Sequence, residues 1–288
     1  MKPEKANELT RLLALVLAII VVVAAATLFI DHFVVIIIVL LLAVAAIYAF
    51  NLMQAKSVQK ALEKQNEIHQ LKINLIKSSL DPHFLFNAIN SVSFSMHKND
   101  IDTASENLAT VTKLMRTALT DIDSFGHELS EEISFIKSYL ALEKFRFSDK
   151  FNYTVKVMPY VNDMTKVPAF LIFCFVENAL KKGVLSKADG GNVAVTIDEN
   201  PTEKMIIARV SDDGLYRNLA DKANETHNTS VANALIDKLN AANEQKITVS
   251  YSPNGNIDGE PQGCLVELKI PVEFNCAPAA VKALQSAK

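Results

Sequence analysis

Two uncharged apolar runs, residues 12–30 and 33–50, dominate the first fifty positions of this 288-residue chain. Each run is close to the roughly 20 residues with which an α-helix crosses the hydrocarbon core of a membrane. Only Asp31 and His32 separate the runs, so the pattern predicts a transmembrane helical hairpin over residues 1–51. A single long helix inside a soluble core is a weaker alternative, because Asp31 and His32 would then be buried without partners.

Basic side chains flank the outer ends of both runs: Lys2, Lys5, Arg11, Lys56, Lys60 and Lys64. Because basic residues stay on the cytoplasmic side, we expect a multi-pass protein of the cytoplasmic (inner) membrane with both termini in the cytoplasm. A cleaved signal peptide competes with this interpretation, since three alanines occupy positions 24–26, but a second apolar run follows at once. An input signal would therefore act within the bilayer, through another membrane protein, or from the cytoplasm.

Residues 52–148 have apolar positions at helical spacing and are expected to form a helical dimerisation region. One apolar stripe runs along its first helix, over Val58, Leu62, Ile68, Leu71 and Leu75. This stripe suits either a parallel homodimer or a helix that packs on its own domain. Further helices are expected at residues 104–121 and 130–147, the second of which begins with a serine and two glutamates.

After residue 147 the pattern changes to the apolar alternation that is typical of strands. The expected strands cover residues 153–157, 193–197, 205–210, 247–251 and 265–270, and the expected helices cover 168–185 and 230–243. Since two helices are too few to cover both faces of a sheet, residues 149–274 are expected to form a two-layer α/β sandwich. A polar loop is expected at residues 213–229 and a tail at 275–288. The predicted fold class is therefore membrane-anchored α+β.

Charge and cysteine content exclude two classes of function. The net charge is −3, and no block of basic residues is interleaved with aromatic ones, so we expect no binding of nucleic acid. The three cysteines, Cys174, Cys264 and Cys276, lack the spacing of a metal site. They are best interpreted as buried thiols of a reducing cytosol.

The sharpest local motif is residues 79–87, which read Ser-Leu-Asp-Pro-His-Phe-Leu-Phe-Asn. Asp81 and Pro82 form a cap and first-turn pair that starts a new helix, or Pro82 kinks a continuing one. His83 and Asn87 are four residues apart, so on a helix they share a face. A lone histidine near a helix start is more often structural than catalytic, and the wider context decides its role.

Residues 82–87 resemble the phosphoacceptor box of the LytS-like family of bacterial sensor histidine kinases. Residues 128–132 and 139–147 resemble the second helical signature of that family. The Val-Pro pair at 167–168 with residues 176–181 resembles its nucleotide-binding helix, and Asp212-Asp213-Gly214 resembles its aspartate-glycine turn. These matches follow one another in the family's order, and they imply a phosphoacceptor region followed by an ATP-binding domain of the GHKL type.

The resemblance implies that His83 accepts a phosphoryl group from ATP. A neutral imidazole near pH 7 supplies the unprotonated nucleophile that phosphoryl transfer needs, and Asn87 can orient it. The implied function is a sensor histidine kinase of a two-component system, which phosphorylates itself on His83 and then passes the group to an aspartate of a response regulator. The alternative is a catalytically weak or inactive membrane scaffold that acts through protein contacts.

The resemblance also implies a nucleotide site with ATP and Mg²⁺. Asn178 would donate a side-chain oxygen to Mg²⁺, and Glu177 would contribute a second oxygen or a water contact. Lys181, one turn further on, would steady the phosphate charge. Asp212 would accept a hydrogen bond from the adenine amino group, and Gly214 would permit a tight turn against the base.

Several residues depart from the family pattern. Asp213 stands where asparagine is common, Tyr216 where a second glycine is usual, and Lys182 where histidine is usual. The later lid, commonly rich in glycine, is represented by residues 227–233, and Lys238 replaces an arginine. A lid without glycine cradles a triphosphate less freely, because fewer backbone amides can turn toward the oxygens.

Overall fold

The computed structural model describes residues 3–26, 33–79, 82–120, 126–215, 226–241, 243–257 and 260–276. The chain divides into two compact units, Met1–Leu62 and Glu63–Lys288. The second unit contains a helical region followed by a mixed α/β sandwich, as the change of hydrophobic pattern predicted.

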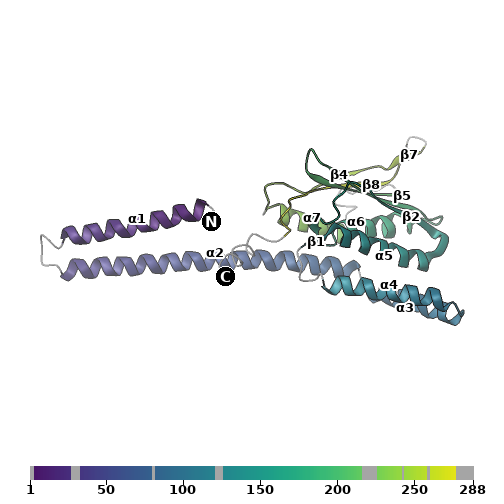
Figure 1. The fold of residues 1–288 in the computed structure, drawn as a ribbon, viewed down its shortest axis with the longest axis horizontal. Helices are drawn as coiled ribbons and strands as arrows, with labels where there is room; N and C mark the ends of the chain where they lie inside the picture. Colours follow the sequence, from purple (N-terminus) through teal and green to yellow (C-terminus); the bar gives the residue numbers. More distant parts are fainter. Residues whose placement is uncertain are drawn as a thin grey trace. The chain divides into compact units, whose positions relative to one another are not determined.

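The first unit contains helix α1 (Pro3–Ala26) and the first part of helix α2 (Phe33–Ser79) (Figure 1). The segment Ile36–Asn74 of α2 is long and apolar enough to cross a membrane, and none of its most apolar window is buried. This segment contains most of the second predicted span. A helix that is apolar and exposed all round is unstable in water, so a lipid environment suits it.

The first predicted span corresponds to a shorter apolar helix, Thr10–Ala24. The rest of that span, residues 27–30, lies outside the described residues, as does the predicted turn at Asp31 and His32. Among the described residues, one helix is therefore both long and apolar enough for a membrane span, and the hairpin of two spans stays a prediction.

The helical part of the second unit contains the end of α2, from Glu63, and the helices α3 (Pro82–His97), α4 (Ile101–Thr120) and α5 (Leu129–Phe147). Helix α3 begins at Pro82, which agrees with a proline at the first helical position, and Asp81 lies outside the described residues. A buried stripe on α3 packs with a buried stripe on α4: Phe84, Ala88, Val92, Ala104, Val111, Leu114 and Ala118. These stripes hold α3 and α4 together as a hairpin.

The sandwich contains one six-stranded sheet with the order β2-β4-β5-β8-β6, and β7 pairs with β8. Its strands are β2 (Phe151–Val157), β4 (Gly191–Asn200), β5 (Met205–Leu215), β6 (Thr248–Ser252), β7 (Gly255–Ile257) and β8 (Glu260–Pro271). Strands β2 and β4 are parallel, and the other neighbours are antiparallel. All five predicted strands are present in this sheet.

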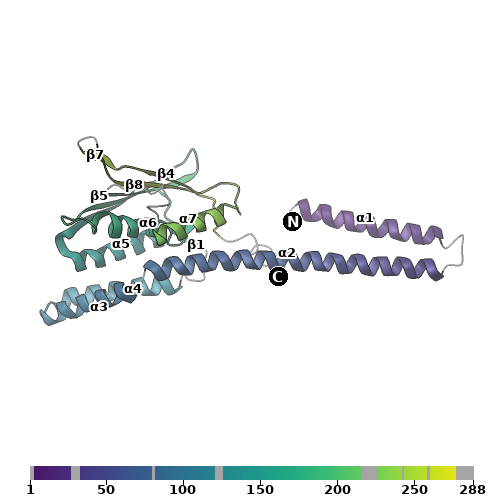
Figure 2. The ribbon, with the colours of Figure 1, turned by 180° about the vertical axis from the view of Figure 1, so that it is seen from behind.

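The sheet has one buried and one polar face, which confirms the predicted two layers. Alternate residues such as Val195, Ala208 and Leu268 are buried, whereas Arg209 on the other face donates to Glu267 at 2.7 Å. Helices α6 (Leu171–Asn178) and α7 (His227–Asn240) lie along the buried face in Figures 1 and 2. Helix α6 continues into a π-helix, η2 (Ala179–Val184).

A two-stranded ribbon, which the hydrophobic pattern did not predict, lies beside the sandwich. Its strands are β1 (Gly126–Glu128) and β3 (Lys166–Pro168), which run antiparallel. Each strand directly precedes the start of a helix, because α5 begins at Leu129 and α6 begins at Leu171. The ribbon therefore brings the first turns of α5 and α6 together.

Candidate functional site

His83 is exposed in the first turn of α3. The side-chain amide nitrogen of Asn87 lies 3.2 Å from its Nδ1 and 3.1 Å from its Nε2. The prediction that these two residues share a helical face is therefore confirmed. An imidazole that solvent reaches, with an amide against it, is accessible to a reaction partner and restricted in orientation.

The neighbouring residue Phe84 packs α3 against α5. Its ring is buried and lies 5.3 Å, between centroids, from the ring of Tyr139 on α5. Tyr139 in turn lies 4.9 Å from Phe173 on α6, edge to face. A continuous row of three aromatic rings thus connects the helix of His83 to the helix of the predicted nucleotide site.

A buried carboxylate lies one turn further along α5. Glu143 is fully buried, and its Oε2 lies 2.8 Å from the guanidinium of Arg146. Burial raises the pKa of Glu143, which Arg146 and Lys181 oppose and Glu177 reinforces. Burial, together with the charge of Glu143, also raises the pKa of Tyr139 well above its ordinary value. Glu143 is thus electrostatically coupled to two residues of the predicted nucleotide site.

Asn178, the last residue of α6, is buried, and its side-chain Oδ1 has no hydrogen-bond partner among the described residues. A buried carbonyl oxygen without a partner is unfavourable unless something binds it. Oxygen is also the ligand type that Mg²⁺ prefers. The residue therefore fits the predicted metal role. The described residues contain no cluster of three or more His, Cys, Asp or Glu that could hold a metal ion.

Glu177, the other predicted metal contact, is held by two protein groups. It is 1% exposed, and its Oε1 accepts a hydrogen bond from Lys181 Nζ at 2.6 Å. Its Oε2 accepts one from Asn228 Nδ2 at 2.5 Å. Both carboxylate oxygens are thus engaged by protein groups.

Asp212 lies buried near the end of β5, beside the π-helix. Its Oδ1 accepts a hydrogen bond from the backbone of Gly214 at 2.9 Å. A Cβ at Gly183 would come within 2.5 Å of the Asp212 carboxyl carbon, and a Cβ at Gly214 within 2.5 Å of the Gly183 carbonyl carbon. Glycine is therefore required at both positions by close packing of the strand end against η2.

The neighbouring departure, Asp213, ties two strands together. Its carboxylate accepts hydrogen bonds from the backbone of Asn192 at 2.7 Å and from the Asn192 side chain at 2.5 Å. Its backbone oxygen accepts one from Lys187 at 3.0 Å. The acid thus has a structural role at the start of β4. Tyr216, the next departure, lies outside the described residues.

The predicted loop and lid differ from the structure. Residues 213–215 belong to β5, residues 216–225 lie outside the described residues, and α7 begins at His227. Thr226 and Thr229 form a capping box at this helix start, with Thr226 Oγ1 accepting from the Thr229 backbone at 3.2 Å. Residues 227–233 are therefore helical. Lys238 further along α7 pairs with Glu67 of α2 at 2.5 Å.

Sequence reasoning missed a buried carboxylate that joins α5 to α6. Glu132 accepts hydrogen bonds from the backbone of Phe170 and of Phe173, each at 2.9 Å. Its Oε2 also lies 2.5 Å from His127 Nε2 on β1. Phe170 has a left-handed backbone and no capping side chain, so Glu132 supplies the cap of α6. The available signal was its place in the segment 128–132 that resembles the family.

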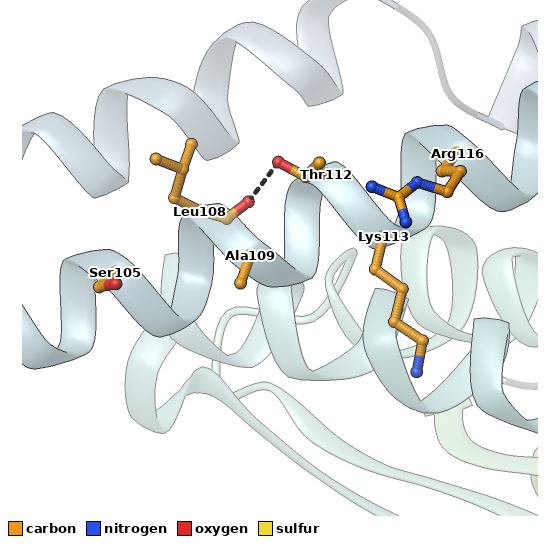
Figure 3. Close-up of a pocket in the computed structure, with 6 residues that line it drawn as sticks. All are labelled: Ser105, Leu108, Ala109, Thr112, Lys113 and Arg116. Atoms are coloured by element: carbon orange, nitrogen blue, oxygen red, sulfur yellow. Dashed lines mark hydrogen bonds between the residues drawn. The ribbon is translucent and has the colours of Figure 1, made fainter.

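A hollow lies on the surface of α4, and none of the predicted site residues lines it (Figure 3). Its lining residues all come from this one helix: Ser105, Leu108, Ala109, Thr112, Lys113 and Arg116. Thr112 Oγ1 donates to the Leu108 backbone oxygen at 2.8 Å, as the dashed line shows. Lys113, at one end of the hollow, donates to Ser134 Oγ of α5 at 2.8 Å.

Residues 71–151 match the family model described as Histidine kinase. The matched segment contains His83, Asn87, Glu132, Tyr139 and Glu143. The resemblance that the motifs indicated is therefore confirmed for the helical region.

A similar sequence is the sensor histidine kinase/phosphatase LytS of Staphylococcus aureus, which is 29% identical over 172 residues. The match covers 59% of this chain and 29% of the relative, so the chain spans less than a third of its length. Among solved structures, the histidine kinase domain of the Erythrobacter litoralis EL346 blue-light activated kinase aligns with a TM-score of 0.40 and 13% identity, over 73% of this chain and 98% of that one. Acinetobacter baumannii histidine kinase AdeS aligns with a TM-score of 0.38 and 12% identity, over 62% and 84%.

Proposed function

We propose that this chain is a membrane-anchored sensor histidine kinase of a two-component system. It phosphorylates His83 with the terminal phosphate of ATP, and the group then passes to an aspartate of a response regulator. The observation that carries the proposal is the exposed imidazole of His83, held by Asn87 in a segment of the histidine kinase family.

His83 acts as the nucleophile. A ring nitrogen with a free lone pair attacks the terminal phosphorus, the bond to the bridging oxygen of ADP breaks, and the ring loses its remaining proton to solvent. Asn87 has no basic group, so it positions the ring and takes no proton. The exposure of His83 supports this assignment, because the proton needs a path to water.

The sandwich, of the GHKL type in this proposal, binds the nucleotide. Asn178 supplies an oxygen to Mg²⁺, which neutralises phosphate charge when it is bound. Lys181, whose side chain is about one-third exposed, contacts phosphate, and Asp212 accepts from the adenine amino group beside Gly214. Glu177 takes at most an indirect part in metal binding, because protein groups occupy both its oxygens.

The chain acts as a homodimer, and the α3–α4 hairpin supplies the interface. Large apolar side chains are exposed on both helices: Phe86, Ile89, Phe94, Met96, Ile101, Leu108, Met115 and Leu119. Many exposed apolar side chains on one helical hairpin favour association. The anchor is the two-span hairpin in the cytoplasmic membrane, with both termini in the cytoplasm.

A non-catalytic scaffold is the second candidate. The engaged carboxylate of Glu177 and the helical, glycine-free start of α7 favour it. Under this alternative the pocket binds nucleotide or a partner without turnover, and His83 accepts no phosphoryl group.

Labelling of the full-length protein in nanodiscs with γ-labelled ATP and Mg²⁺ separates the two candidates. We expect label on the wild type and none on His83→Gln, with nucleotide binding unchanged in that variant. Asn178→Ala should lose both labelling and metal-dependent binding. Nucleotide binding without label in the wild type would support the scaffold, and undiminished label on His83→Gln would refute the assigned acceptor.

A further inference from the structure

Glu177 connects two elements of the sandwich that the sequence places far apart. Lys181 belongs to η2, one turn after Glu177, and Asn228 belongs to the first turn of α7. Their nitrogen atoms lie 2.6 Å and 2.5 Å from different oxygens of the same buried carboxylate. A single side chain thus holds both a cation and a helix start.

The start of α7 does not need Asn228 for its own capping. Thr226 and Thr229 already satisfy that helix end with a capping box. The Asn228 side chain is therefore available to donate to Glu177, while its backbone oxygen accepts from Cys174 Sγ at 3.1 Å. Cys174 and Glu177 are three residues apart on α6, so one face of α6 makes both contacts.

Lys181 is a partly exposed member of the group. Its side chain is 32% exposed, against 1% for Glu177. The buried carboxylate neutralises the lysine, so less positive charge is presented to an entering polyphosphate. Glu143 and Arg146 lie in the same electrostatic neighbourhood, and both are held within α5. Of the two cations, Lys181 is the more exposed, with 32% of its side chain exposed against 19% for Arg146.

We propose that Glu177 is a positioning residue that stores Lys181 and fastens the start of α7, and that nucleotide phosphate competes with Glu177 for Lys181. The proposal rests on the nucleotide site of the proposed function. It replaces a metal-ligand role for Glu177 with a counter-ion role. Because Asn228 continues to donate to Glu177 when Lys181 turns away, the carboxylate keeps a partner during the exchange.

The two roles predict opposite effects of Glu177→Gln. If Glu177 is a counter-ion, Glu177→Gln removes its charge and releases Lys181. Mg·ATP should then bind about two- to fivefold more tightly, the range expected for a partly exposed ion pair. Adenosine, which has no phosphate, should bind as it does to the wild type. A metal ligand that is neutralised should instead weaken Mg·ATP binding, and the loss should grow as Mg²⁺ is lowered.

Calorimetric titration of full-length protein in nanodiscs with Mg·ATP and with adenosine tests the competition. Lys181→Gln should weaken Mg·ATP binding, and Lys182→Gln, at the exposed neighbouring lysine, should leave it unchanged. In the double variant Glu177→Gln/Lys181→Gln, the gain in affinity from Glu177→Gln should disappear, because the proposal has Glu177 act on phosphate binding only through Lys181. A gain that persists without Lys181, or weaker Mg·ATP binding by Glu177→Gln, overturns the proposal.

The same titration separates this proposal from the proposed function. If the wild type binds no nucleotide, both are wrong. If it binds nucleotide with the predicted Glu177 effects but is not labelled on His83, the kinase function alone is wrong.

Hydrogen exchange tests the fastening of α7. Asn228→Ala should speed exchange of the backbone amides in the first turn of α7 several-fold, since the tie to Glu177 is lost. Ser230→Ala, an exposed change in the same helix, is the matched control. Equal exchange in the two variants contradicts the fastening role.

Discussion

Glu132 of α5 accepts the backbone hydrogen bond of Phe173 at 2.9 Å, across 41 positions of sequence. The same carboxylate also accepts from the Phe170 amide and contacts His127, so a residue of α5 caps the start of α6. The helix that carries Glu177 and Asn178 is therefore held at its start by a residue of the segment matched to the histidine kinase family.

Replacement of Glu132 by alanine should be strongly destabilising. It leaves the backbone amides of Phe170 and Phe173 and the buried His127 side chain without this acceptor, and breaking a buried pair of this kind costs about 3–5 kcal/mol. Thermal unfolding in nanodiscs measures the effect. Glu131→Ala, an exposed neighbour that caps α5, should cost only about 1 kcal/mol. Equal losses in the two variants would contradict the capping role of Glu132.

Replacement of Asn87 by alanine should slow labelling of His83 roughly tenfold, because the ring loses the group that orients it. The affinity for ATP should not change, since the nucleotide site is on other elements. The initial rate of labelling at saturating ATP is the measurement. Asn90→Ala, an exposed asparagine on the same helix, should be silent. A rate for Asn87→Ala equal to that of Asn90→Ala refutes the orienting role.

Phe84 and Phe86 should have separable effects although they are two residues apart. Phe84→Ala removes a buried ring that stacks on Tyr139, at a cost of about 3–5 kcal/mol in the free energy of unfolding. Phe86 is 66% exposed, so Phe86→Ala should weaken dimerisation while the fold is retained. Unfolding and sedimentation experiments distinguish the two. A dimer unaffected by Phe86→Ala would argue against the proposed interface.

The pH dependence of stability should contain a contribution from Glu143. Burial raises the pKa of Glu143 in the folded state, so the folded protein holds this proton more tightly than the unfolded chain. Its stabilising contribution is complete below the unfolded value of about 4.3 and is lost as pH rises through the raised pKa. The stability of Glu143→Gln relative to wild type should therefore increase as pH rises from about 4.3 toward neutrality. A constant difference in melting temperature over that range contradicts this assignment.

The sequence predicted those features that depend on short, regular spacing. His83 and Asn87 could be placed on one face because a helix brings every fourth residue together. Their side chains are in hydrogen-bonding contact, as expected. The strands of the sandwich were recognised from strict alternation, as in Val193, Val195 and Ile197.

Contacts between distant segments could not be read in this way. The ribbon of β1 and β3 has three residues in each strand, too few for a period. Glu177 was expected near Mg²⁺ because of its neighbour Asn178, but Asn228 approaches it from 51 positions away. Residues 227–229 were predicted as part of a loop and lid, so the start of α7 at His227 was missed. Thr226 and Thr229 nevertheless have the spacing of a capping box.

The π-helix after Asn178 makes the position of Gly183 depend on the number of residues in this segment. In η2 the backbone of Leu185 donates to the oxygen of Leu180, five positions back, where an α-helix would use four. This wider turn delivers Gly183 to the carboxylate of Asp212. Removing one residue between Asn178 and Gly183 would restore an ordinary helix and rotate everything beyond it by about 100°. Asn178 would stay in place, but Gly183 would no longer pack against Asp212. Insertions and deletions here should therefore be far less tolerated than substitutions.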